Sequence, residues 1–96
     1  MTVRDAPFRR WEGALFRVVG TNVLLARPAR SGIDLLAGSA GMLWQVLEAP
    51  KRGNDVVAVL ADLYGVAPAA IERDVSTLLE DLKGRGWVEQ DCGGYD

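Results

Sequence analysis

The hydrophobic pattern of the chain changes period between Ser31 and Leu47, and this change limits the folds that the sequence can adopt. Upstream, short runs rich in β-branched and aromatic residues indicate strands. Downstream, apolar residues recur three and four positions apart, as they do on one face of a helix. The segment 33–36 therefore predicts a strand that leads through Gly38-Ser39 into a helix. We expect a small sheet joined to a helical half.

Two upstream strands are predicted at 14–19 and 23–26. Gly20-Thr21 separates them, and this pair suits a two-residue type II′ turn, in which only the first residue needs a positive φ. Pro28 lacks a backbone donor and ends the second strand. The first two strands are therefore expected to form a β-hairpin.

The third strand is predicted at 32–36, where alternation places Ile33 and Leu35 on one face and Asp34 and Leu36 on the other. One face is therefore apolar and the other mixed. Three short strands leave at least one edge unpaired unless another element covers it. We expect a strand with a free edge at this point.

Two helices are predicted after the third strand. The first is expected to begin at an N-cap formed by Ser39 and to end before Pro50. The second is expected to be capped by Asn54 and to end at Gly65 in the left-handed conformation. The apolar stripe predicted for this second helix consists of Val56, Val57, Leu60, Leu63 and Tyr64.

A third helix is predicted from Pro68 to Arg85, since proline fits the first turn, where its missing N–H has no intrahelical partner. A short extended segment at 87–88 follows it. The predicted fold is an α+β domain in which a three-stranded antiparallel sheet is followed by three helices, similar to a winged helix-turn-helix. The stripe of the third helix is Ile71, Val75, Leu78 and Leu82, widened by Leu79.

A chain of 96 residues is long enough for one domain and too short for two. We expect a flexible arm at 1–10, a folded domain at 11–89 and a flexible tail at 90–96. No apolar run approaches the roughly 20 residues that a membrane span needs. The charged start also lacks the features of a secretory signal, so we expect a cytoplasmic protein without a membrane partner.

The chain contains no histidine and only one cysteine, Cys92. Many catalytic sites depend on histidine, and multi-cysteine metal sites need several cysteines. An unactivated thiol in a glycine-rich tail is most simply an incidental exposed residue. We therefore expect no catalytic residues, no metal and no cofactor.

Charge divides the chain into a basic and an acidic part. Residues 1–52 carry eight basic and four acidic groups, a balance of 8 − 4 = +4, so the total of −2 leaves −6 for the rest. In a DNA-binding helix-turn-helix the third helix would approach the phosphates, yet its first turns carry Glu72 and Asp74 against Arg73 alone. DNA binding stays the alternative to peptide capture at the third strand, and a generic protein-interaction module is the fallback.

Several segments, taken in order, resemble the PqqD family: 33–36, then 44–47, the helix end at 60–65, Asp74-Val75 with its leucines, and 86–88. The similarity spans about residues 11–89. It implies a precursor-peptide recognition domain of pathways that make ribosomally synthesised, post-translationally modified peptides (RiPPs). Such a domain binds a leader peptide as an added strand, catalyses nothing, and presents the precursor to a maturation enzyme.

The resemblance also implies residues and partners. The partner enzyme would be a radical-SAM protein or a leader peptidase, and a lasso-peptide type of pathway is favoured because the chain is short. No nucleic acid is expected, whereas the free edge leaves a homodimer open. The implied peptide contacts are Ile33, Asp34 and Leu35 on the strand, and Asp74, Val75, Leu78 and Leu82 on the helix.

Overall fold

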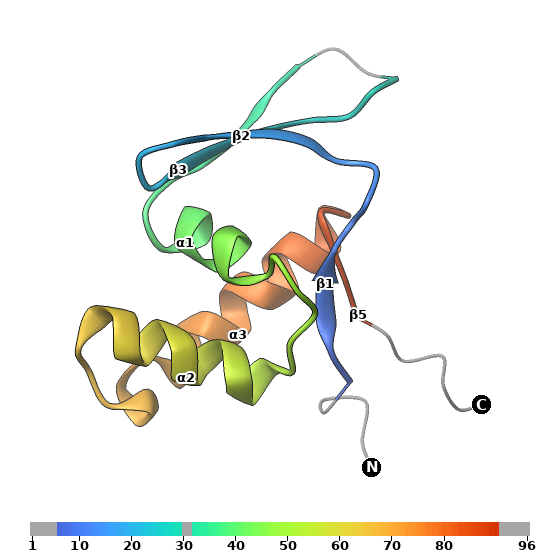
Figure 1. Cartoon of the computed structure of the whole chain (residues 1–96). Helices are drawn as coiled ribbons and strands as arrows, with labels where there is room; N and C mark the ends of the chain where they lie inside the picture. Colours follow the sequence, from blue (N-terminus) through green and yellow to red (C-terminus); the bar gives the residue numbers. More distant parts are fainter. Residues whose placement is uncertain (1–5, 30–31, 91–96) are drawn as a thin grey trace.

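The computed structural model describes residues 6–29 and 32–90 of the chain. In Figure 1 a sheet lies on one side of α1, while α2 and α3 lie on the other. The predicted three-stranded antiparallel sheet followed by three helices is confirmed. The elements are β1 (Phe8–Arg10), β2 (Leu15–Val19), β3 (Asn22–Ala26), β4 (Asp34–Leu36), α1 (Ser39–Val46), α2 (Gly53–Tyr64), α3 (Pro68–Gly84) and β5 (Val88–Gln90).

The three-stranded sheet has the order β2-β3-β4, so β2 and β4 are its two edges. A two-residue turn joins β2 to β3 next to the Val19–Asn22 pair. As predicted, Gly20 takes a positive φ of 66° and Thr21 does not. Leu24 of β3 lies opposite Leu35 of β4. The third predicted strand is thus an edge strand.

Strand β1 lies within the segment 1–10 that was expected to be a flexible arm. It pairs antiparallel with β5, and the buried Phe8 exchanges backbone hydrogen bonds of 2.7 and 3.0 Å with Lys51. The last residue of β5, Gln90, likewise falls in the expected tail. The folded part of the chain is therefore wider than the predicted 11–89. The rest of the predicted flexible arm and tail, residues 1–5 and 91–96, lies outside the described residues.

Two predicted helix caps are wrong. Gly38, with a φ of 59°, precedes α1, so Ser39 is the first helical residue and makes no capping hydrogen bond. Arg52 is the N-cap of α2, which places Asn54 inside the first turn. Gly38 with its positive φ leads into α1 and the extended Arg52 leads into α2, and neither of these N-cap residues makes a side-chain capping hydrogen bond.

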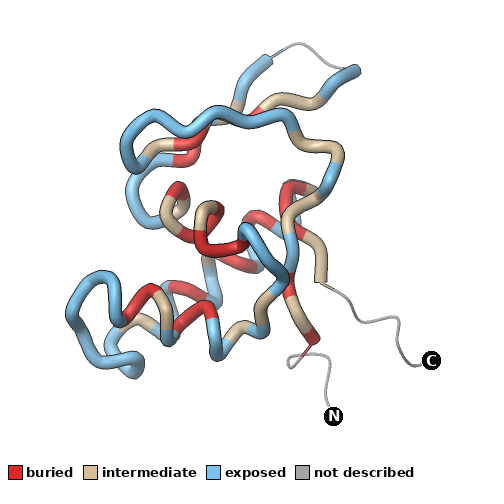
Figure 2. Tube along the Cα trace, in the orientation of Figure 1, coloured by how far each residue is buried: buried red, intermediate tan, exposed pale blue. Residues whose placement is uncertain are grey.

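The predicted stripe of α2 is partly wrong at its end. Leu63 and Tyr64 are 55% and 47% exposed, because the last turn of α2 projects past the core (Figures 1 and 2). Ala61 is buried in their place. Gly65 ends the helix in the left-handed conformation with a φ of 68°, as predicted.

The core lies between the sheet, α1 and the inner faces of α2 and α3, where Figure 2 shows the buried positions. Trp44 of α1 is fully buried and meets Phe16 of β2 edge to face, with ring centroids 5.4 Å apart. Trp44 is therefore a core residue. None of the helices in the described part of the chain is long and apolar enough to cross a membrane.

Arg10 closes the core on the β2 side. Its guanidinium lies over the rings of Phe16 and Trp44, 4.8 and 5.1 Å from their centroids, and its Nε donates to the Trp44 carbonyl at 2.9 Å. Burial lowers the pKa of Arg10, and the charge of Glu48 opposes this effect. An arginine nevertheless stays protonated at neutral pH, so the contact remains a cation–aromatic one.

Helix α1 approaches the sheet very closely at Gly41. A Cβ at this position would overlap the carbonyl oxygen of Thr21 and lie 2.9 Å from that of Leu36. The helix therefore rests directly on the backbone of the β2–β3 turn and of β4. Glycine is required here because any side chain would push α1 away from the sheet.

Candidate functional site

The free side of β4 presents backbone groups that β3 does not use. The two-residue turn closes on the Val19–Asn22 pair, and hydrogen-bonded pairs alternate along antiparallel strands from that point. By this alternation Asp34 and Leu36 bond to β3, whereas the N–H and C=O of Leu35 point away from it. Within residues 6–29 and 32–90, β4 pairs with β3 alone. We call the free side of residues 33–35 the β4 edge.

Side chains of β4 alternate between solvent and core. Ile33 and Leu35 are 68% and 56% exposed, whereas Leu36 is buried. Asp34 is half-buried on the core side, where one carboxylate oxygen accepts a hydrogen bond of 2.7 Å from the indole Nε1 of Trp87. The mixed face predicted for this strand is therefore its core face, and the apolar face lies outward.

Trp87 belongs to a cluster that joins the sheet to the end of α3. The guanidinium of Arg27 lies 4.2 Å from the ring centroid of Trp87 and 4.9 Å from that of Trp11. Arg27 also donates to the carbonyl oxygen of Arg85 at 2.6 Å. Together with the Asp34 bond, these contacts hold the start of β4 beside the C-terminal end of α3. Sequence reasoning missed the cluster, because its members come from distant segments without any spacing signal.

The helix residues implied by the resemblance divide into two groups. Val75 and Leu82 are 3% and 1% exposed and belong to the core. Asp74 is exposed, and Leu78 is half-buried against the core. Asp74 and Leu78 are four residues apart and so lie on the same flank of α3. Of the four, these two are the ones that a ligand can reach directly.

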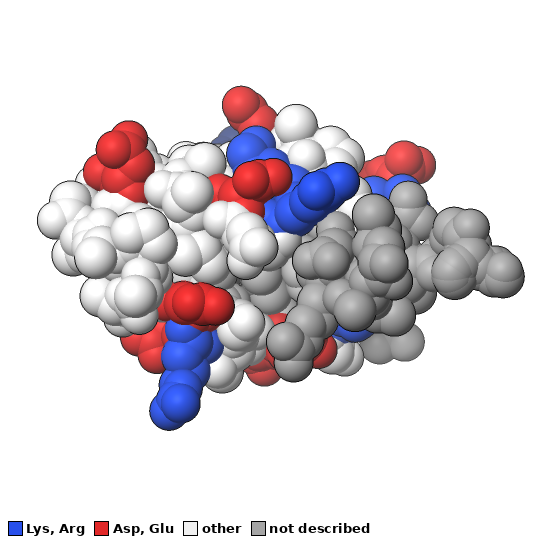
Figure 3. All heavy atoms as spheres, turned by 90° about the horizontal axis from the view of Figure 1, so that it is seen from below, with Lys and Arg blue, Asp and Glu red and all other residues white. Residues whose placement is uncertain are grey.

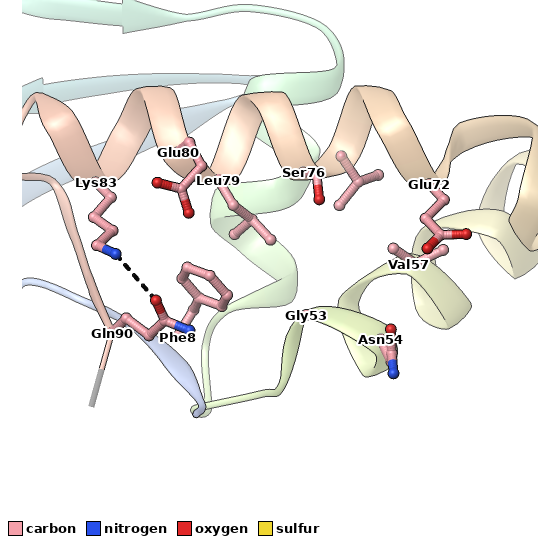
Figure 4. Close-up of a pocket in the computed structure, with 11 residues that line it drawn as sticks. Phe8, Gly53, Asn54, Val57, Glu72, Ser76, Leu79, Glu80, Lys83 and Gln90 are labelled. Carbon is pink, nitrogen blue, oxygen red and sulfur yellow. Dashed lines mark hydrogen bonds between the residues drawn. The ribbon is translucent and has the colours of Figure 1, made fainter. Parts of the chain in front are cut away.

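A hollow of about 600 Å³ lies elsewhere, between α3, the start of α2 and the β1–β5 pair (Figure 4). Lys83 reaches across it and donates to Gln90 Oε1 at 3.0 Å. Its lining includes neither β4 nor Asp74, Leu78 or Leu82, so it is a separate feature from the β4 edge. It is lined by Phe8, Gly53, Asn54, Val57, Glu72, Val75, Ser76, Leu79, Glu80, Lys83 and Gln90.

The model of the family described as "Coenzyme PQQ synthesis protein D (PqqD)" matches residues 23–88. The chain belongs to the PqqD family. The matched region runs from β3 through the first residue of β5, so it includes the β4 edge, all three helices and Trp87. The resemblance inferred from the sequence is thereby confirmed. No curated protein matches this PqqD-family chain.

Two solved structures share the fold of this PqqD-family member. One is TbiB1 in complex with the TbiA(beta) leader peptide, with 21% identity over 84% of this chain and 94% of that chain and a TM-score of 0.72. The other is the solution NMR structure of the PqqD truncation of Methylobacterium extorquens PqqCD, which represents a functional, stand-alone RiPP recognition element. It shares 21% identity over 86% of this chain and 88% of that chain, with a TM-score of 0.66.

Removing the indole donor is expected to loosen the junction between β4 and α3. Trp87→Phe keeps an aromatic ring but deprives the half-buried Asp34 carboxylate of its 2.7 Å hydrogen bond. We expect a loss of about 1–3 kcal/mol in the free energy of unfolding, measured by urea denaturation. Trp11→Phe is the control, because it makes the other ring beside Arg27 smaller and leaves the hydrogen bond to Asp34 in place. Equal losses in the two variants would show that the hydrogen bond contributes nothing.

Proposed function

We propose that this PqqD-family chain binds the leader segment of a ribosomally made precursor peptide by strand addition at the β4 edge. In this role it catalyses no reaction of its own and presents the precursor to a maturation enzyme. The observation that carries the proposal is the backbone of Leu35, which has no partner strand among the described residues, together with the exposed apolar side chains of Leu35 and of Ile33 just before β4. A structural neighbour that holds a leader peptide supports it.

An added strand would form its hydrogen bonds with the outward N–H and C=O of Leu35, as in other cases of β-strand addition. Main-chain bonds supply affinity that depends little on sequence, so specificity must come from side chains. Those proposed to contact the peptide are Ile33 just before β4, Asp34 and Leu35 on β4, and Asp74 and Leu78 on α3. Val75 and Leu82 are buried, so they would contribute indirectly, by packing in the core beneath Leu78.

We also propose a type of pathway, a partner enzyme and an oligomeric state. The pathway would be of the lasso-peptide type, and the enzyme that receives the precursor would be a leader peptidase or a radical-SAM protein. The acidic side chain of Asp74 would favour a leader with a basic residue next to its apolar anchor. The edge strands also allow two copies of the chain to pair, as a homodimer.

DNA binding is disfavoured by the charges on α3. Arg73 is the one basic residue in the first half of the helix, next to the exposed Glu72 and Asp74. Figure 3 shows separate acidic and basic groups on the face seen there, with no continuous basic surface. A helix that approaches phosphates needs a basic footprint, and acidic groups at this position oppose it.

The proposal is tested by fluorescence anisotropy with two labelled probes. One is the leader part of any short precursor peptide that the gene neighbourhood proves to encode, and the other is duplex DNA. We expect saturable binding of the peptide and at most weak DNA binding that disappears as salt rises. Tight, saturable binding to DNA, with none to the peptide, would overturn the proposal in favour of the winged-helix alternative.

A further inference from the structure

The outer face of the three-stranded sheet is apolar next to the β4 edge. Leu35 is 56% exposed there, and Leu24 lies directly opposite it on β3. Ile33, which directly precedes β4, is 68% exposed. The nearest charge in this cross-strand row is Arg17 of β2, on the far side of Leu24. A strand added to β4 would therefore meet Leu35 and not the arginine.

This inference rests on the proposed function, because it concerns the peptide that occupies the β4 edge. The side chains of an added strand alternate between the face that α3 flanks and the outer face. Each outward side chain lies opposite a side chain of β4, about 5 Å away between Cβ atoms. An outward residue of the leader is thus a direct neighbour of Leu35.

We propose that the leader is recognised on both faces of the extended sheet, and that Leu35 selects an apolar residue on the outer face. The recognised segment is then a continuous run of three apolar residues. The middle one turns toward α3 and Leu78, and its two neighbours lie outward over Leu35 and Ile33. A strand read on one face alone would instead alternate apolar and polar residues.

Exposed leucines on their own carry no such meaning, since folded proteins expose many apolar side chains. Here Leu24 and Leu35 lie directly opposite each other, Ile33 directly precedes β4, and among the described residues β4 has no strand on its other side. Natural sheets commonly place a charged residue at such an edge to prevent association. Positions 33 and 35 carry no charged residue. An apolar strand can therefore pair with this edge without burying a charge.

The experiment is a selection from a displayed random library of peptides of about twelve residues, long enough to include one strand. The baits are the whole unmodified chain, Leu35→Lys, and Val19→Lys as a matched control. Val19 is 54% exposed on the same outer face but lies on β2, at the opposite edge. Circular dichroism and thermal unfolding establish that both variants are folded.

The unmodified chain and Val19→Lys are expected to enrich the same pattern, three successive apolar residues. Leu35→Lys is expected to enrich an acidic residue at one outward position and to keep the inward apolar residue. Peptides selected by the unmodified chain should bind Leu35→Lys about tenfold more weakly.

Two other results would be informative in different ways. If no bait enriches any peptide, the proposed strand addition itself fails. If peptides are enriched but their outward positions are polar, or are the same for Leu35→Lys and the unmodified chain, strand addition stands and recognition on the outer face is refuted.

Discussion

Replacing Gly41 with alanine is expected to destabilise the fold by about 3 kcal/mol, in the upper range for overpacked cores. The added methyl group would overlap the Thr21 carbonyl oxygen and lie 2.9 Å from that of Leu36. Both are backbone atoms of the sheet, which cannot rotate away as a side chain can. Helix α1 would have to move, and the fully buried Leu43 and Trp44 would move with it.

Gly84→Ala is the matched control, because a Cβ at that position meets nothing within 4 Å. Alanine favours helix over glycine, so this variant should be unchanged or more stable by about 0.5 kcal/mol. Urea unfolding followed by tryptophan fluorescence compares the two variants. Should Gly41→Ala unfold at the same urea concentration as Gly84→Ala, the close approach of α1 to the sheet would be refuted.

Leu35→Pro is expected to abolish peptide binding while leaving the chain folded. Proline removes the one N–H of β4 that points away from β3, and its ring occupies the space that a partner strand needs. Edge strands tolerate proline where the N–H faces solvent. The lost hydrogen bond and the obstruction together should weaken binding of a labelled leader at least about tenfold in fluorescence anisotropy.

Val18→Pro provides the control at the other edge. By the same alternation the N–H of Val18 points away from β3, so proline there makes the same chemical change on β2. Peptide affinity should be unaffected by it. Equal loss of binding in the two variants would mean that the peptide does not add to β4, whereas loss in Val18→Pro alone would move the site to β2.

Local signals in the sequence predicted much of this fold. Gly20 marked the hairpin because a two-residue turn needs a positive φ at its first position, and Pro68 marked the start of α3 because the first turn tolerates proline. The β4 edge was predicted for a similar reason: Pro28 and the period change isolated a short third strand that had no further strand to pair with. Each inference used residues within a few positions of one another.

The features that were missed depend on contacts between distant segments. Nothing near Phe8 shows that it would pair with Lys51 and with β5. The bond from Trp87 to Asp34 joins residues 53 positions apart. Of the implied helix contacts, Val75 and Leu82 are equally apolar neighbours of Leu78 in the stripe, and only their packing shows that they are buried.

The pairing of β1 with β5 has a consequence for how this unit can be combined with other polypeptides. Phe8 lies opposite Gln90, so the chain enters and leaves the domain at neighbouring points, away from the three-stranded sheet (Figure 1). A short linker between these points would close the chain into a ring without disturbing the core. The domain could equally be inserted into a surface loop of a larger enzyme, and its β4 edge would still face outward, ready to receive a strand.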